Sequence, residues 1–151
     1  MHELILMRHA QAAPAELGAE DYTRPLTAAG RRAAAQAART LTGADVPIER
    51  VLLSPARRTQ ETAAIVAREL KLAETLLQAV PELYAAPLAV IREVIRREHG
   101  GARSLLVVGH NPGISELARQ LSVQPGRGHL PTAGLCRLPL TEAQWRQLTQ
   151  P

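Results

Sequence analysis

The chain has 151 residues, of which 46% are hydrophobic and 21% charged, a composition typical of one globular domain. Its single cysteine, Cys136, excludes an intramolecular disulfide and a cysteine-rich zinc site. A net charge of +4 with only 2% aromatic residues argues against nucleic-acid binding, because single-strand recognition uses aromatic stacking. The sequence contains no apolar run of membrane-spanning length and no signal-peptide pattern, so we expect a cytoplasmic protein that does not bind membranes.

The predicted elements alternate between short apolar strands and amphipathic helices. In chain order they are a strand at 4–7, a loop over 10–26, a helix over 27–41, a strand at 50–54, a helix over 55–70, an edge strand at 75–80, a helix over 86–99, a strand at 105–109, a helix over 112–121, a loop over 123–133, a strand at 135–140 and a short helix after Thr141. We expect Pro55 and Pro112 to open their helices, because a proline in the first turn loses no needed donor.

This alternation predicts a three-layer α/β/α fold with a mostly parallel central sheet, built by residues 1–151 as one domain. In such sheets ligands bind beyond the carboxyl ends of the strands. The residues that follow each predicted strand are therefore the first candidates for a functional site.

Charged and imidazole side chains occupy those positions. Arg8 and His9 follow the first strand, Ser54 and then Arg57-Arg58 follow the second, His110 follows the strand at 105–109, and Glu82 comes shortly after the edge strand. Each has an ordinary interpretation as a strand end in water, a solvated helix charge or a turn residue. The sheet topology would bring all of them to one rim, which favours a site.

Arginine forks and imidazoles at one rim would form an electropositive pocket suited to a tetrahedral oxyanion such as phosphate or sulfate. The sequence has no glycine-rich phosphate loop with Lys and Ser/Thr, and no metal-binding motif. Cys136 lies inside a predicted strand, without the Cys-x5-Arg pattern of a cysteine phosphatase. A histidine nucleophile that needs no cofactor or metal remains the best candidate.

Four segments resemble the histidine phosphatase (phosphoglycerate mutase-like) superfamily. They are Leu6-Met7-Arg8-His9-Ala10, the segment from Arg24 to Gly30, the segment from Ser54 to Thr62, and Val108-Gly109-His110-Asn111-Pro112. Larger members carry insertions that build a lid subdomain, and this chain has no room for one. It is most similar to the small phosphohistidine phosphatases of the SixA type, in which the Pro81-Glu82-Leu83 segment also recurs.

The resemblance implies a role for each matching residue. His9 would be the nucleophile, and Arg8, Arg58 and His110 would bind the phosphoryl group. The family spacing selects Arg58 rather than Arg57. Glu82 would be the candidate general acid, which a phosphohistidine substrate would not require. The possible pocket residues are Ser54, Thr132 and Ala133.

The chain departs from the family pattern near the nucleophile. Ala10 replaces the usual glycine, and Ala12 stands where ester-cleaving relatives often have threonine. No asparagine occurs before Asn111. The missing hydroxyl donor weakens an assignment as an ester mutase.

The leading hypothesis is a phosphatase that removes phosphate from histidine on a phosphorelay or phosphotransfer protein through a phospho-His9 intermediate. One alternative is hydrolysis of a small phosphate ester or polyphosphate. Another is an inactive module that binds phosphate or phosphoproteins, which the intact His9 argues against because binding alone needs no nucleophile.

Overall fold

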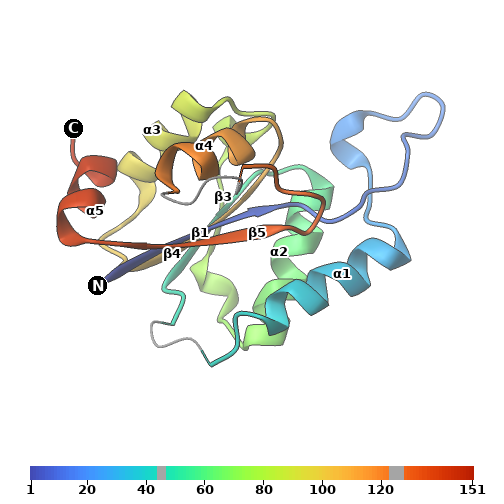
Figure 1. The fold of residues 1–151 in the computed structure, drawn as a ribbon. Helices are drawn as coiled ribbons and strands as arrows, with labels where there is room; N and C mark the ends of the chain where they lie inside the picture. Colours follow the sequence, from blue (N-terminus) through green and yellow to red (C-terminus); the bar gives the residue numbers. More distant parts are fainter. Residues whose placement is uncertain (44–46, 123–127) are drawn as a thin grey trace.

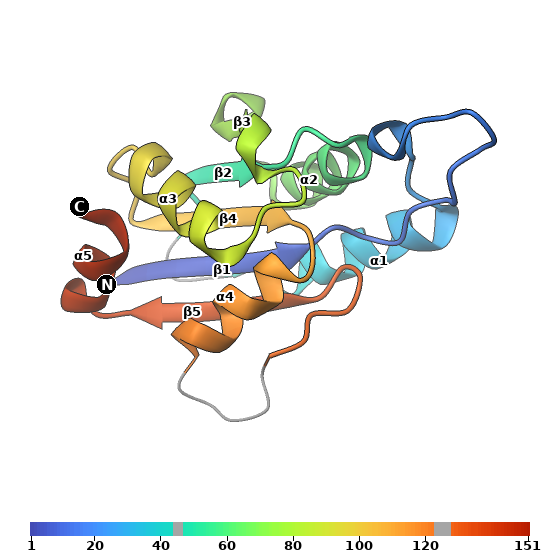
Figure 2. The ribbon, with the colours of Figure 1, turned by 90° about the horizontal axis from the view of Figure 1, so that it is seen from above.

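A five-stranded sheet in the order β3-β2-β4-β1-β5 forms the centre of the computed structural model, which describes residues 1–43, 47–122 and 128–151 (Figure 1). Its strands are β1 (His2–Arg8), β2 (Arg50–Leu53), β3 (Leu77–Ala79), β4 (Ser104–Gly109) and β5 (Leu135–Leu140). The first four strands run parallel, and β5 pairs antiparallel with β1 (Figure 2).

Helices cover both faces of this sheet. They are α1 (Ala28–Arg39), α2 (Arg57–Leu70), α3 (Leu88–Glu98), α4 (Gly113–Leu121) and α5 (Glu142–Thr149). In Figure 1 the helices α1 and α2 lie on one side of the sheet and α3 and α4 on the other. The predicted three-layer fold with a mostly parallel sheet is confirmed. Between β1 and α1 the structure has one 3-10 helix, Asp21–Thr23, and no lid subdomain. No helix in the described ranges is long and apolar enough to cross a membrane.

Alternation along the strands divides the core between the two faces of the sheet. Leu4 and Leu6 of β1 pack with the buried side chains of α3 and α4, whereas Ile5 and Met7 pack toward the alanine-rich α1 and toward α2. Strand β4 is buried at every position, as expected for a central parallel strand covered by helices on both faces. The sequence contains no phenylalanine, and the core consists mainly of aliphatic side chains with Trp145 as its one buried aromatic side chain among the described residues.

Several predicted boundaries differ from the structure. Helix α2 begins at Arg57 with Ala56 as its N-cap, so the prediction that Pro55 opens the helix is wrong. Pro112 is likewise the N-cap of α4 and not its first residue. The edge strand is shorter than predicted because a 3-10 helix, Glu74–Leu76, precedes it. Residues 123–127 of the predicted loop at 123–133 lie outside the described residues.

The long segment between β1 and α1, residues 9–27, is called the excursion, and backbone contacts close it at its base. Ala12 and Leu26 form an antiparallel bridge, and the Ala13 N–H donates to the Pro25 carbonyl at 2.8 Å. At Gly30 in α1 a Cβ atom would lie 2.2 Å from the Gln11 carbonyl oxygen, so only glycine allows this close approach. Both ends of the excursion are therefore held against the body of the protein.

Candidate active site

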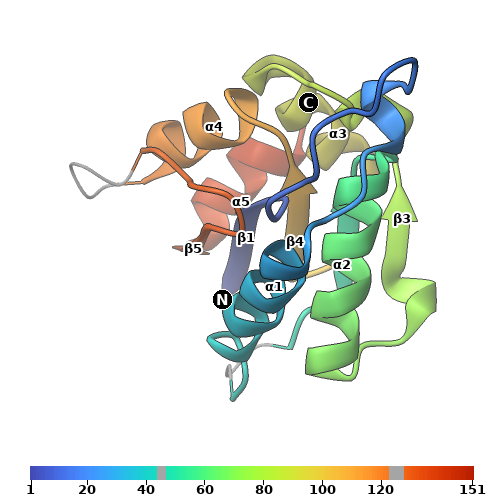
Figure 3. The same cartoon turned by 90° about the vertical axis from the view of Figure 1, so that its right-hand side faces the viewer.

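The carboxyl ends of β1, β2 and β4 meet at one end of the molecule, which faces the viewer in Figure 3. A cavity of about 290 Å³ lies there. It is lined by Arg8, His9, Gln11, Ala12, Arg24, Arg58, Ala85, His110, Asn111 and Thr132. The structure thus brings together five of the residues selected from the sequence, namely Arg8, His9, Arg58, His110 and Thr132.

His9 follows β1 and is fixed through both its backbone and its ring. Its backbone N–H donates to the Gly109 carbonyl at 3.1 Å, and its carbonyl accepts from the Ala133 N–H at 3.1 Å. Its Nδ1 lies 2.7 Å from the Ala10 carbonyl oxygen. Because a carbonyl can only accept, Nδ1 carries the hydrogen and Nε2 is left with a free lone pair. The residue after the nucleophile candidate therefore sets its tautomer.

Both imidazoles in the cavity are held neutral at physiological pH. Burial, followed by the positive charges of Arg58 and Arg8, lowers the pKa of His9 from 6.5 to about 4, although the bond to the Ala10 carbonyl opposes the shift. Burial and the Arg58 charge also lower the pKa of His110 to about 4. The two ring centroids are 5.3 Å apart, so a positive charge on His9 would further lower the pKa of His110.

Arg58 and Arg57 occupy neighbouring positions in the first turn of α2 but point to different surroundings. The Arg58 side chain is 8% exposed and lines the cavity. The Arg57 side chain is 55% exposed and pairs with Glu61, with 3.2 Å between Nε and Oε2. Successive helix positions diverge by about 100°, which is why only one of the two arginines reaches the cavity.

His110 follows β4, which lies between β1 and β2 in the sheet. Its ring contacts Ser54, the residue that follows β2. Its Nε2 lies 2.8 Å from the Ser54 hydroxyl, which also accepts from the Ala56 N–H at 3.2 Å. The other ring nitrogen of His110, Nδ1, lies on the side of Arg58, whose guanidinium N–H groups can only donate. The Arg58 guanidinium lies 3.5 Å from that Nδ1, which is long for a hydrogen bond. The buried Ser54 thus orients the His110 ring.

Arg8 is the last residue of β1 and is half-buried. Its guanidinium makes one long contact, 3.4 Å to the Leu130 carbonyl oxygen. Its Nε is buried and has no hydrogen-bond partner among the described residues. A buried donor without a partner costs free energy, and no described residue offsets that cost at the Arg8 Nε.

Comparisons with known proteins agree with this geometry. A model of the histidine phosphatase superfamily (branch 1) matches residues 4–85. The chain is 34% identical over 122 residues to phosphohistidine phosphatase SixA of Escherichia coli K12, covering 79% of this chain and 73% of that protein. The chain belongs to the histidine phosphatase superfamily.

Two further relatives support the assignment. An uncharacterised protein of Mycobacterium tuberculosis H37Rv is 35% identical over 116 residues, covering 74% of this chain and 67% of the relative. The solved structure of the protein histidine phosphatase SixA complexed with tungstate has a TM-score of 0.80 to this histidine phosphatase at 29% identity, covering 94% of this chain and 90% of that one. Tungstate is a tetrahedral oxyanion, the kind of ligand that arginine forks bind.

The remaining predicted site residues of this histidine phosphatase lie at different depths. Thr132 lines the cavity, and Ser54 supports His110 from a fully buried position. Ala133 is buried in the left-handed conformation at φ 61°, and its N–H holds the His9 carbonyl. Glu82 is exposed, and its carboxylate pairs with Arg97 at 2.6 Å instead of lining the cavity.

Sequence reasoning did not select two residues that contact Arg58. The Asp21 carboxylate pairs with its guanidinium, and Tyr84 lies beside it, with 5.9 Å between the Arg58 Cζ and the ring centroid. Neither follows a strand directly. The one sequence signal is that Asp21 and Arg24 are oppositely charged at a spacing of three in a predicted loop, and the structure pairs them at 2.9 Å.

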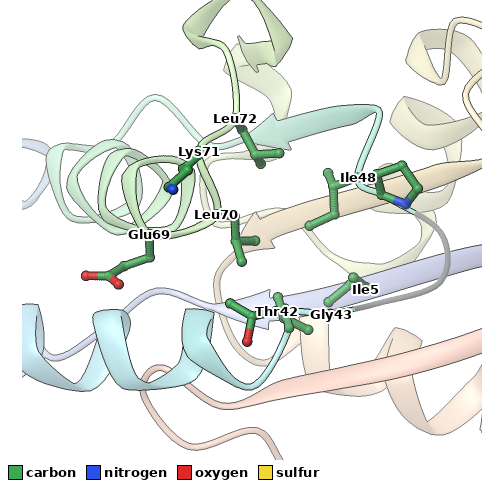
Figure 4. Close-up of a pocket in the computed structure, with 10 residues that line it drawn as sticks. Ile5, Thr42, Gly43, Ile48, Glu69, Leu70, Lys71 and Leu72 are labelled. Atoms are coloured by element: carbon green, nitrogen blue, oxygen red, sulfur yellow. The ribbon is translucent and has the colours of Figure 1, made fainter.

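A second cavity, of about 310 Å³, lies where α1 and α2 end, at the opposite end of the sheet. In Figure 4 the side chains of Ile5, Ile48, Leu70 and Leu72 gather around it, and the Glu69 carboxylate points away. Glu69 and Lys71 are the titratable side chains of this otherwise mostly apolar lining. The described residues do not contain any group of three or more His, Cys, Asp and Glu arranged to hold a metal ion.

Proposed function

We propose that this protein is a phosphohistidine phosphatase that removes the phosphoryl group from a histidine side chain of another protein. The observation that carries the proposal is the state of His9, a neutral imidazole with Nδ1 bonded to the Ala10 carbonyl and two arginines beside it. Its free Nε2 lone pair makes it a nucleophile at neutral pH. The similarity to SixA of E. coli supports the substrate class.

In the proposed reaction the His9 Nε2 attacks phosphorus. A new P–N bond forms to His9 as the P–N bond of the substrate breaks and its electron pair passes to the departing ring. Arg8 and Arg58 neutralise the phosphoryl oxygens, and His110 is assigned as a third donor to them. Water then attacks phospho-His9, releasing inorganic phosphate and restoring the neutral ring. Phosphoryl transfer depends mostly on positioning and charge stabilisation, which these donors supply.

The composition of the cavity lining favours a P–N bond over an ester. The residues that line it include arginines and imidazoles but no carboxylate. With its other ring nitrogen protonated, a phosphohistidine leaves as a neutral imidazole, whereas an alkyl ester leaves as an alkoxide that needs a proton from a general acid. A site without a carboxylic acid is therefore better matched to phosphohistidine than to a small phosphate ester.

The test compares two peptides of the same sequence, one with phosphohistidine and one with phosphoserine at the same position. We expect the phosphohistidine peptide to be turned over at least about 10²-fold faster, the lower end of what general acid catalysis contributes. Faster release of phosphate from phosphoserine would establish the ester alternative. Turnover of neither peptide, with tungstate still bound, would establish the inactive binding module. The cytoplasmic location stays a prediction, which cell fractionation tests.

The lowered pKa of His9 predicts how activity depends on pH. Only the neutral ring attacks, and that form predominates above a pKa of about 4. Activity should therefore be insensitive to His9 ionisation between pH 7 and about pH 5 and should fall below about pH 4. The ring carbon and proton signals of His9, followed by NMR from pH 8 to 3.5, measure the midpoint directly. A midpoint near 6.5 would contradict the proposed environment.

The exposed position of Glu82 predicts a small effect of Glu82→Gln. A general acid contributes roughly 10²- to 10⁴-fold, but Glu82 pairs with Arg97 outside the cavity lining. We expect less than about a threefold loss on both a phosphohistidine peptide and phenyl phosphate, as for a surface substitution. Glu98→Gln is the matched control, because Glu98 is the other carboxylate bonded to Arg97. A loss of about 10²-fold confined to Glu82→Gln on phenyl phosphate would establish Glu82 as an acid.

A further inference from the structure

The side chain of Arg58 is held by one residue of the excursion between β1 and α1. Its NH1 donates to the Asp21 carbonyl oxygen at 2.9 Å, and its NH2 donates to the Asp21 Oδ2 at 3.0 Å. Backbone and side chain of Asp21 thus bind the two terminal nitrogens of the same guanidinium. Of the five N–H groups of an arginine, two are engaged by this one residue.

Asp21 is itself anchored through both carboxylate oxygens. Its Oδ1 accepts from Arg24 NH1 at 2.9 Å, and its Oδ2 accepts from the Tyr84 hydroxyl at 2.5 Å. The Tyr84 ring also meets the His110 ring edge-on, with 5.5 Å between centroids. The contacts join the excursion, α2 and the segment that follows the 3-10 helix Pro81–Leu83, so the position of the carboxylate is defined from three directions.

The ionisation of Asp21 distinguishes two roles, a proton donor to the leaving group and a charged partner of Arg58. The hydrogen bonds from Tyr84 and Arg24, together with the bond from Arg58, hold the pKa of this carboxyl well below its usual range. Asp21 is therefore deprotonated at neutral pH and has no proton to give to a leaving group. Its negative charge also lies beside the cation that would receive an anion, which by itself would weaken anion binding.

We propose that Asp21 is a positioning residue that holds the Arg58 guanidinium in the orientation that binds the phosphoryl group. The proposal rests on the proposed function, because it assigns Arg58 to phosphoryl binding. An arginine side chain has many rotamers, and fixing it in advance avoids ordering it each time a substrate binds. Asp21 is half exposed and does not line the cavity, so it acts through Arg58 and not on the substrate.

Tungstate affinity, measured by calorimetry on the full chain, tests the proposal without depending on the identity of the substrate. In Asp21→Asn the carbonyl bond and the size of the side chain remain while the charge is lost. We expect tungstate to bind about 10-fold more weakly, because misplaced groups lose much of their effect. Charge alone predicts the opposite, since removing an anion from beside the site should tighten binding. Tighter or unchanged binding in Asp21→Asn would overturn the proposal.

A double-mutant cycle shows whether Asp21 acts through Arg58. Adding Asp21→Asn to Arg58→Ala should change tungstate affinity by less than about twofold, because the group that Asp21 positions is already gone. The same 10-fold loss in both backgrounds would mean that Asp21 supports the cavity in general, and would refute the proposal. If the phosphohistidine peptide is not a substrate but the cycle behaves as expected, the positioning role holds and only the substrate assignment fails.

Discussion

Replacing His9 with alanine is expected to lower phosphohistidine turnover by at least about 10⁴-fold, the scale seen when a covalent nucleophile is removed. The ring supplies the attacking Nε2, whereas the Nε2 of the other cavity imidazole, His110, is engaged by Ser54. Rapid quenching of wild type should trap a phosphoprotein that is stable to base and labile to acid. His9→Ala should show no such signal.

The matched control is His129→Ala, which removes an exposed histidine that is not among the residues lining the cavity. It should keep both turnover and the trapped phosphoprotein. Tungstate should still bind to His9→Ala, since Arg8 and Arg58 remain, and that binding shows that the variant is folded. A base-stable phosphoprotein that persists in His9→Ala would assign the nucleophile to another histidine and would contradict the proposed reaction.

The second large effect is expected at Arg58. Arg58→Ala should lower kcat by about 10²- to 10³-fold, the loss typical when one donor to a developing oxyanion is removed. Arg57→Ala should cost less than about threefold, because Arg57 is exposed and pairs with Glu61. The two variants differ by one position in the same helix turn and remove the same charge, so they separate local geometry from net charge. A larger loss in Arg57→Ala would reverse the assignment.

Arg58→Lys refines the result. Lysine keeps the positive charge but lacks the planar fork that contacts Asp21 through two nitrogens. We expect it to recover only part of the activity lost in Arg58→Ala. Full recovery would mean that charge alone matters at this position and that the orientation of the guanidinium does not.

The sequence predicts the parts of the site that depend on strand order. His9 and His110 directly follow apolar runs, and parallel strands bring the ends of such runs to one edge. The structure places both in the same cavity because β1 and β4 are neighbours in the sheet. The family spacing selects Arg58 over Arg57, and the direction of each side chain follows from the helix turn.

Contacts between distant segments could not be predicted in this way. Asp21 meets Arg58 across 37 positions and Tyr84 across 63, and neither pairing leaves a periodic pattern in the sequence. Glu82 follows the edge strand, yet the 3-10 helix at Pro81–Leu83 directs its carboxylate to Arg97. Proximity to a strand end in the sequence therefore identifies candidates, but the turn that follows the strand decides which of them face the cavity.

The closed base of the excursion between β1 and α1 allows residues to be inserted at its tip without disturbing the active site. The bridge between Ala12 and Leu26 keeps the two stems of the excursion paired, while Leu17 near its tip is fully exposed. Extra residues grafted at the tip would lengthen the excursion without displacing the backbone of His9. New recognition elements could thus be added beside the reacting centre by insertion, leaving the paired stems and the chemistry as they are.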